Sequence, residues 1–218
     1  MTPLPSPTGY SRFLARLVQA RPELQAELDA PATIDAARLA AWLAATPLTE
    51  DNLKSALRRI KQKALANLAS RDLAGLADLA EVVEGMTLVA DAAVAAALDC
   101  VEAGLVARYG APRNAGGERQ QLIVVGMGQL GGRELNVSSD IDLIFVYPAD
   151  GDTDGDRSIS NFEFFTRLGR GLINALAEIT GDGQVFRVDM RLRPNGDSGP
   201  LACSFDMLEN YFYTQGRE

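Results

Sequence analysis

The first half of the chain carries apolar residues at helical spacing. From Ser11 to about Arg108 the sequence is rich in Ala, Leu, Glu, Arg and Lys, and β-branched residues almost never alternate with polar ones. Apolar positions three or four residues apart form one stripe on a helix. This half is therefore predicted to be helical, with helices at residues 11–18, 22–28, 34–45, 49–70, 73–77 and 80–108.

The pattern changes after a linker at residues 113–119. Two β-rich runs, 122–125 and 141–147, are bounded by turn residues, and residues 185–192 form a third. Between the second and the third run, residues 162–179 show a helical stripe of Phe and Leu. This order predicts the α+β class, in which a helical region is followed by a compact α/β domain with a small mixed sheet.

A basic run, Arg58, Arg59, Lys61 and Lys63, falls on one of the predicted helices. Runs of like charge usually face the solvent. We interpret this run as a solvated helix face.

Composition narrows the chemistry. The 218 residues include no histidine, which removes histidine-based triads and histidine-ligated zinc from consideration. The formal net charge of −8 argues against bulk binding to nucleic acid or to an anionic membrane. Residues 88–107 look apolar but contain three acidic residues, so they predict a buried helix and not a membrane span. The start of the chain lacks a secretory signal and the two cysteines suit a reducing compartment, so we expect a cytoplasmic protein.

A glycine-rich segment follows the first β-rich run. Gly126, Gly128 and Gly131 match the G-x-G-x-x-G pattern of dinucleotide-binding folds. Such a fold needs a full crossover helix and then a strand that ends in an acid about 20 residues later. Here the next strand starts near Ile141, which leaves roughly two turns of helix, and its acids stand at its beginning. The spacing argues against dinucleotide binding, which stays the weaker alternative fold.

Two acidic residues stand at the beginning of the second β-rich run. Asp140 and Asp142 are separated by one residue, so on a strand both carboxylates leave the same face. Close carboxylates repel one another unless a cation lies between them, and Mg²⁺ prefers few carboxylates together with phosphate oxygens. Gly131 and Gly132 allow close backbone approach, and the N–H groups of a short helix after them can hold a phosphate. The segment therefore predicts a site for Mg²⁺ and phosphate.

Residues 187–193 alternate strictly between polar and apolar. As a strand, this segment places its three arginines and Asp189 on one face. Asp189 adds a third carboxylate, and the arginines can neutralise a transferred phosphoryl group. Each feature alone has a simpler interpretation, because an isolated acidic pair is usually solvated and a charged alternating strand can be an exposed edge. Their combination on neighbouring elements favours metal-dependent nucleotidyl transfer.

A second acidic segment, Asp150 to Gly155, matches the start of an EF-hand loop. Its position 12 is Asn161, where a bidentate Glu belongs, and a strand precedes it in place of a helix. We interpret this segment as a solvated acidic loop.

The chain resembles the bacterial glutamine synthetase adenylyltransferases and adenylyl-removing enzymes along most of its length. The similarity is carried by GMGQLGGRELNVSSDIDLIFVY at 126–147, FFTRLGRGLINAL at 164–176, VFRVDMRLRPNGDSGPL at 185–201 and LENYFYTQGRE at 208–218. Such enzymes hold two related nucleotidyltransferase domains, of which the N-terminal one removes AMP from glutamine synthetase and the C-terminal one adds it. The sequence GMG, Met190 and the run GDSGP resemble the N-terminal copy.

This resemblance implies a polymerase-β-like nucleotidyltransferase domain, with residues 1–112 as the helical region and 113–202 as the catalytic core. Residues 203–218 would begin a C-terminal helical region that is truncated here. The expected catalytic and metal-binding residues are Asp140, Asp142 and Asp189. The expected nucleotide- and phosphate-binding residues are Gly128, Gly131, Gly132, Ser138, Ser139, Arg191 and Arg193. Gln129 and Val137 depart from the Lys and Phe common in the family, so Gln129 receives no catalytic role.

The function that the resemblance implies is deadenylylation of glutamine synthetase by phosphorolysis, which regulates nitrogen assimilation and turns AMP-tyrosine and phosphate into tyrosine and ADP with Mg²⁺. Adenylylation of the same partner with ATP is the alternative, because sequence spacing does not separate the two directions. A fragment that binds glutamine synthetase, nucleotide or a regulatory signalling protein of nitrogen metabolism without turnover is a further one. No nucleic-acid or membrane partner is expected.

Overall fold

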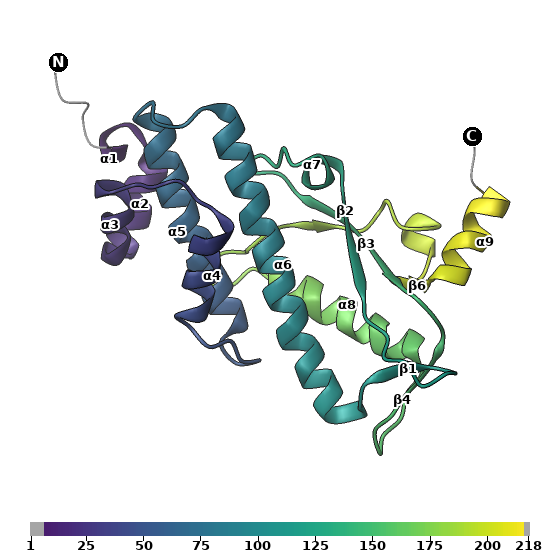
Figure 1. Ribbon diagram of the computed structural model, residues 1–218. Helices are drawn as coiled ribbons and strands as arrows, with labels where there is room; N and C mark the ends of the chain where they lie inside the picture. Colours follow the sequence, from purple (N-terminus) through teal and green to yellow (C-terminus); the bar gives the residue numbers. More distant parts are fainter. Residues whose placement is uncertain (1–6, 216–218) are drawn as a thin grey trace.

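The helical half of the molecule forms much as its sequence predicts. The computed structural model describes residues 7–215, and these adopt the expected α+β class with a small mixed sheet. Figure 1 shows α1 to α5 on one side, the sheet with α8 and α9 on the other, and the long α6 between them. The expectations for the extreme N-terminus and for residues 216–218 lie outside the described residues. The helices that precede the first strand are α1 (Pro7–Tyr10), α2 (Arg12–Ala20), η1 (Pro22–Leu24), α3 (Gln25–Asp29), α4 (Ala36–Ala44), α5 (Leu53–Leu73) and α6 (Leu79–Tyr109).

Short polar side chains and a glycine set several helix ends. The carboxylate of Asp35 accepts the N–H of Arg38 at 2.7 Å, and that of Asp78 accepts the N–H of Glu81 at 2.9 Å. Each bond satisfies a backbone donor that the first turn of a helix leaves free. The helix α6 ends where expected because Gly110 adopts a φ of 83°, in the left-handed region.

Two helix boundaries differ from the sequence prediction. The separate helix at residues 73–77 is wrong, because α5 runs on to Leu73 and the chain then turns with Gly75 at a φ of 67°. The start at residue 49 is also wrong. Thr49 donates its N–H to the side-chain oxygen of Asn52 at 2.8 Å, and this turn delays α5 to Leu53.

Residues 88–107 lie inside α6, and their small side chains pack into the core, as the full burial of Ala90 and Ala97 shows. Within residues 7–215, none of the helices combines the length and the apolar character that a membrane span requires.

The sheet is centred on β3 (Ile141–Tyr147), which pairs antiparallel with β2 (Ile123–Met127). On its other side, β5 (Val188–Asp189) pairs parallel with the beginning of β3 and β6 (Ala202–Ser204) with its end. A separate ribbon joins β1 (Pro112–Asn114) to β4 (Gly151–Thr153). The remaining helical elements are α7 (Gly128–Gly131), α8 (Asn161–Ala177), η2 (Gly196–Ser198) and α9 (Phe205–Gln215).

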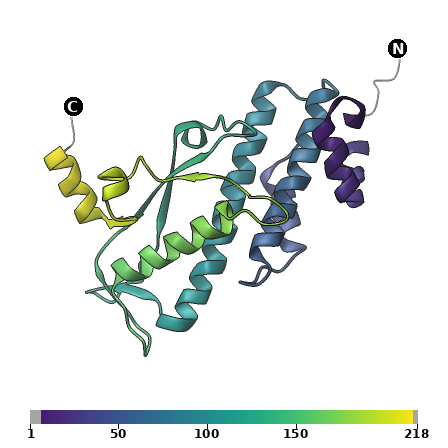
Figure 2. The ribbon, with the colours of Figure 1, turned by 180° about the vertical axis from the view of Figure 1, so that it is seen from behind.

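Helix α8 covers one face of this sheet, as the view from behind shows (Figure 2). It packs closely because a Cβ on Gly169 would lie 2.7 Å from the ring of Phe145. Beside this contact, Tyr147 and Phe165 stack with ring centroids 4.7 Å apart. The same hydrophobic cluster reaches Leu57 in α5, so the helical half and the sheet share a continuous core.

Part of the basic run of α5 faces protein, so its interpretation as a solvated face is wrong for Arg58 and Lys61. Arg58 is only 1% exposed. Its guanidinium donates to the carbonyls of Lys54 at 2.8 Å, Ala175 at 3.0 Å and Gly183 at 2.7 Å, and also to the carbonyl of Glu178. The last turn of α8 leaves carbonyls without helical partners, and Arg58 supplies the missing donors from another helix.

Lys61 makes a second contact of this kind. Its ammonium group donates to the carbonyl of Val185 and lies 4.2 Å from the centre of the Phe186 ring. Burial lowers the pKa of Lys61 to about 8. Of the four basic residues in the run, only Arg59 is mostly exposed.

The alternating strand expected at residues 187–193 is wrong beyond Asp189. Only two residues of this segment form β5, and the chain then turns, with the N–H of Arg193 donating to the carbonyl of Met190 at 3.2 Å. Asn195 follows in the left-handed region with a φ of 59°. Proline at the next position after Arg193 removes a ladder donor, so the turn wins over the alternating pattern.

Replacing Arg58 tests how far the fold depends on this contact. We expect Arg58→Met to lower the free energy of unfolding by about 3 kcal/mol, because buried carbonyls lose a charged donor. The measurement is urea unfolding followed by circular dichroism. Arg59→Met is the matched control, since its side chain is exposed, and it should cost under about 0.5 kcal/mol. Equal losses in the two variants would show that the buried contacts of Arg58 add nothing to stability.

Candidate functional site

The glycine-rich segment folds as one short helical turn against the acids of β3. Because α7 begins directly after β2, Gly128 and Gly131 lie inside it, and the short helix expected after the glycines is wrong. Gly128 has a φ of 54°, and a Cβ there would lie 2.5 Å from Oδ2 of Asp142. A Cβ on Gly131 would meet the carbonyl oxygen of Gly126 at 2.6 Å. Only glycine lets this backbone approach so closely.

The three predicted carboxylates come from two neighbouring strands. Asp142 of β3 stands directly opposite Asp189 of β5 in the parallel register, so both side chains lie on one face. Asp140 precedes β3 by one residue and shares that face, two positions from Asp142. Adjacent strands lie about 4.8 Å apart and alternate residues of one strand about 7 Å apart. The backbone therefore gathers all three acids at one end of the sheet.

Arginines engage two of these acids. Arg187 donates to Asp140 and also to the carbonyl of Ser138 at 3.2 Å. Arg191 folds back on Asp189, with its Nε 2.8 Å from Oδ2 and its backbone N–H 2.8 Å from Oδ1. The side-chain hydrogen bond from Arg191, helped by its backbone N–H, holds the pKa of Asp189 below the usual range.

Asp142 is the acid left available. No hydrogen bond or ion pair to another residue within 7–215 engages its half-buried carboxylate. On α7 it faces the backbone of Gly128, which cannot neutralise a negative charge, and the guanidinium whose charge acts on it, that of Arg191, is already bound to Asp189. A carboxylate that is partly removed from water and makes no ion pair favours a cation from outside the chain.

The donor set fits Mg²⁺, although the side chains are not drawn together into a metal cluster. Among the described residues, no three acidic or cysteine side chains stand close enough to hold an ion between them. The arginine contacts explain this spacing, since Asp140 and Asp189 each turn toward a guanidinium. Carboxylate oxygens in register on adjacent strands are the ligands that Mg²⁺ takes, and an ion would compete with the arginines for them. The metal-binding role of the three acids stays a prediction.

The other predicted residues divide into those near the acids and one that turns away. Ser139 donates its hydroxyl to Oε1 of Gln129 at 2.6 Å, and exposed Ser138 precedes it. Arg193 donates to the carbonyl of Met190 at 2.7 Å and is largely buried in the turn after β5. Gly132 ends α7 and Arg191 stays over Asp189. The structure thus brings the serines, glycines and Arg191 to the acids, but not Arg193.

Two residues that the sequence did not select help to shape the site. Oε1 of Gln129 accepts the hydroxyl of Ser139 and, at 3.3 Å, the N–H of Asn136, so this side chain fixes the loop that leads to Asp140. Its sequence signal was only a departure from the family's usual lysine. Arg187 was placed on the polar face of an expected strand, and its pairing with Asp140 depends on the parallel register.

The acids of the second acidic segment are exposed, as predicted, but residues 151–153 form β4 in place of a loop, and two of the acids also make structural bonds. Asp150 accepts the hydroxyl of Tyr147 at 2.8 Å. Asp154 accepts the N–H of Ala111 at 2.7 Å and pairs with Arg113, whose hydrogen bond lowers the pKa of Asp154. These bonds fasten the ribbon of β1 and β4 to the end of α6.

Comparison with known proteins identifies the family of the chain. A family model described as glutamate-ammonia ligase adenylyltransferase matches residues 4–218. The chain belongs to this family. It is 56% identical over 223 residues to the bifunctional glutamine synthetase adenylyltransferase/adenylyl-removing enzyme of Aromatoleum aromaticum, with 100% of the chain covered. Proteins of the same name match at 59% in Burkholderia mallei, over 96% of the chain, and at 54% in Ralstonia nicotianae, over 99%.

The chain spans about a quarter of the length of these relatives, since it covers 24% of each. The family resemblance predicted from its motifs is confirmed.

The arginine contact at Asp189 can be tested by titration. We expect Arg191→Gln to raise the pKa of the Asp189 carboxyl toward its ordinary value, because the loss of the guanidinium removes the main stabilisation of the charged form. Carbon-detected NMR of the Asp189 carboxyl over the acid range measures this shift. Arg193→Gln should move the pKa less, since Arg193 acts only through its charge at a distance. The reverse order of the two effects would contradict the hydrogen-bonded geometry.

Proposed function

We propose that this site removes AMP from glutamine synthetase by phosphorolysis. An oxygen of inorganic phosphate attacks the phosphorus of the AMP-tyrosyl ester, the bond from phosphorus to the tyrosine oxygen breaks, and that oxygen takes up a proton. The products are ADP and free tyrosine. The observation that carries the proposal is the unpaired Asp142, in register with Asp189 and pressed against the backbone of α7. The relatives' printed name includes adenylyl removal beside adenylyl transfer, and the resemblance of GMG, Met190 and GDSGP to the N-terminal copy supports the removing direction.

The acids and arginines have complementary roles in this reaction. Asp140, Asp142 and Asp189 would hold Mg²⁺, which supplies positive charge to the attacking and leaving oxygens when it is bound. Arg187 and Arg191 already lie against two of these carboxylates. When the carboxylates turn to a cation, both guanidiniums become free to neutralise the oxygens of the phosphate groups. Gly131 and Gly132 are exposed, so phosphates could approach the backbone of α7 there.

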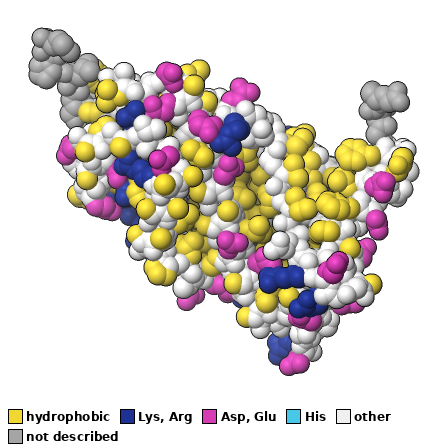
Figure 3. Space-filling model, viewed as in Figure 1, with side chains coloured by type: hydrophobic (Ala, Val, Ile, Leu, Met, Phe, Trp, Pro, Cys, Tyr) yellow, Lys and Arg dark blue, Asp and Glu magenta, His cyan; other side chains and the backbone are white. Residues whose placement is uncertain are grey.

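An apolar strip extends from the acids along the open face of the sheet. Ile123 and Val125 of β2 share the face of Asp142 through their pairing with β3, and they are 40% and 37% exposed. Figure 3 shows hydrophobic side chains gathered beside α6 in this part of the surface. Such a strip next to charged groups suits a protein substrate whose modified tyrosine must reach the acids.

Adenylylation with ATP is the second candidate, because the relatives carry both activities in their printed name. The same acids would then serve the attack of tyrosine on the α-phosphorus, with pyrophosphate as the leaving group. A regulatory signalling protein remains a proposed partner without an assigned surface.

Product analysis separates the two directions. AMP-modified glutamine synthetase is incubated with the chain, phosphate and Mg²⁺, and the nucleotide products are identified. A second arm uses the Aromatoleum aromaticum relative with its matching quarter replaced by this chain, so that missing parts of a longer protein do not decide the outcome. Phosphate-dependent release of ADP supports the proposal. Pyrophosphate formed from ATP, without ADP release from modified enzyme, would assign this quarter to the other direction.

Within that replacement enzyme, Asp142→Asn tests the central carboxylate. We expect deadenylylation to fall at least about 100-fold, since one charge that holds the metal and stabilises the transition state is lost. The free energy of unfolding should change by under about 0.5 kcal/mol, because the side chain of Asp142 makes no hydrogen bond or ion pair within residues 7–215. Asp156→Asn is the control, as it removes an exposed acid that is not one of the three predicted metal ligands. Normal turnover in Asp142→Asn would refute the assignment.

A further inference from the structure

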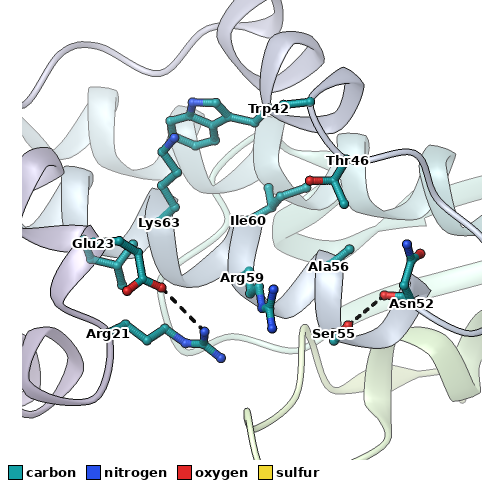
Figure 4. Close-up of a pocket in the computed structure, with 12 residues that line it drawn as sticks. Arg21, Glu23, Trp42, Thr46, Asn52, Ser55, Ala56, Arg59, Ile60 and Lys63 are labelled. Carbon is teal, nitrogen blue, oxygen red and sulfur yellow. Dashed lines mark hydrogen bonds and ion pairs between the residues drawn. The ribbon is translucent and has the colours of Figure 1, made fainter.

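A cavity of about 350 Å³ lies in the helical half of the molecule. It opens between the end of α2, the helix α4 and the first half of α5, and Figure 4 shows the side chains around it. Cavities of this size hold small organic ligands. None of its lining residues belongs to the carboxylate site, so the proposed function leaves it without a role.

Positive charge dominates the polar part of this cavity. Arg21, Arg59 and Lys63 line it, and Glu23 is its one acidic residue. Glu23 is already accompanied by Arg21, with 3.8 Å between their charged atoms. Arg21 also pairs with Asp182 and Lys63 with Glu27, so Arg59 carries the positive charge that no acid of the described residues offsets in an ion pair. An unpaired positive charge in a cavity attracts anions.

Arg59 is free to bind one. In the part of the chain that the structure describes, it makes no hydrogen bond, ion pair or ring contact. Its neighbour Lys63 holds Glu27 at 3.3 Å and lies 4.5 Å from the centre of the Trp42 ring. A guanidinium without a partner presents a fork of donors that matches the oxygens of a carboxylate or a phosphate.

The rest of the lining is apolar. Trp42 and Ile60 line it, together with the buried residues Leu24 and Ala56. Figure 4 shows Lys63 pointing to Trp42 on one side and the guanidiniums of Arg21 and Arg59 on the other. A ligand with an apolar body and an anionic end can therefore satisfy both kinds of surface at once.

We propose that this cavity binds a small organic anion, with a carboxylate or phosphate group at Arg59 and an apolar body against Ile60 and Trp42. Arg21 connects the cavity to the rest of the molecule, because it also pairs with Asp182 in the segment that precedes β5. An anion that draws Arg21 toward itself competes with Asp182. Binding here is independent of the proposed function.

The chain contains a single tryptophan, so Trp42 reports on this cavity alone. Phenyl phosphate and benzoate are titrated separately into the chain while tryptophan fluorescence and the NMR signal of the indole N–H are followed. Benzamide, which has the same ring without charge, is the matched ligand control. We expect a saturable change with at least one of the anions, and the stronger of the two identifies the preferred group. No saturable change in either signal, or equal binding of benzamide, would overturn the proposal.

Substitutions show which residue binds the anionic group of the ligand. Arg59→Gln should weaken binding of the preferred anion about tenfold or more, because a hydrogen bond to a charged group is lost. Arg157→Gln removes one exposed positive charge in the loop before α8 and should leave binding unchanged. Equal affinity in wild type and Arg59→Gln would contradict the role of Arg59. Both variants should unfold at the same urea concentration as the wild type, so a change in binding cannot come from loss of fold.

Discussion

One buried guanidinium joins the two halves of this molecule. Arg58 enters from α5 and binds carbonyls at the end of α8 and in the loop that follows it. A charge removed from water is tolerated only when its partners surround it, so α5 and this loop have to be placed together. Lys61 and Gln62 of α5 add bonds to the carbonyls of Val185 and Asp182. The helical half thereby fixes the segment that leads into β5.

The position of β5 decides the chemistry of the site. Because the segment before it is held by α5, Asp189 arrives opposite Asp142 in the parallel register. The N–H of Ile141 then donates to the carbonyl of Arg187 at 2.9 Å, and the Arg187 side chain reaches Asp140. Two acids are thus held by arginines while the third is free for a cation. The helical half and the sheet that carries the carboxylates share one hydrophobic core, which holds them in a fixed relative position.

Local sequence signals were enough for much of this architecture. The helix α6, its end at Gly110 and the helix α8 follow from apolar spacing and a glycine with a positive φ. The shared face of Asp140 and Asp142 follows from the alternation of a strand. Their assembly with Asp189 could be expected because three polar features fell on consecutive elements, although the pairing itself was not visible.

The failures came where distant backbone decides. The burial of Arg58 depends on free carbonyls more than 100 positions away, which no charge pattern in α5 reveals. A turn after Met190 replaces the end of the strand predicted at 187–193, and Arg193 lies in this turn and not on the strand. Gln129 differs from the lysine common in the family, yet its side-chain oxygen Oε1 accepts the hydroxyl of Ser139 and the N–H of Asn136 in the loop before Asp140. For Arg58 and for the turn after Met190 the deciding partner is a backbone group, which is the same in every sequence.

The most direct test of this dependence is hydrogen exchange in Arg58→Lys, which keeps the charge and removes the fork of donors. Exchange at single amides is compared with wild type and with Arg59→Lys, the neighbouring exposed control. We expect faster exchange at Val185 and at Ile141, whose N–H bonds to the carbonyl of Arg187, while the amides in the middle of α6 keep their protection. Unchanged protection at both residues in a folded Arg58→Lys would show that α5 does not position β5.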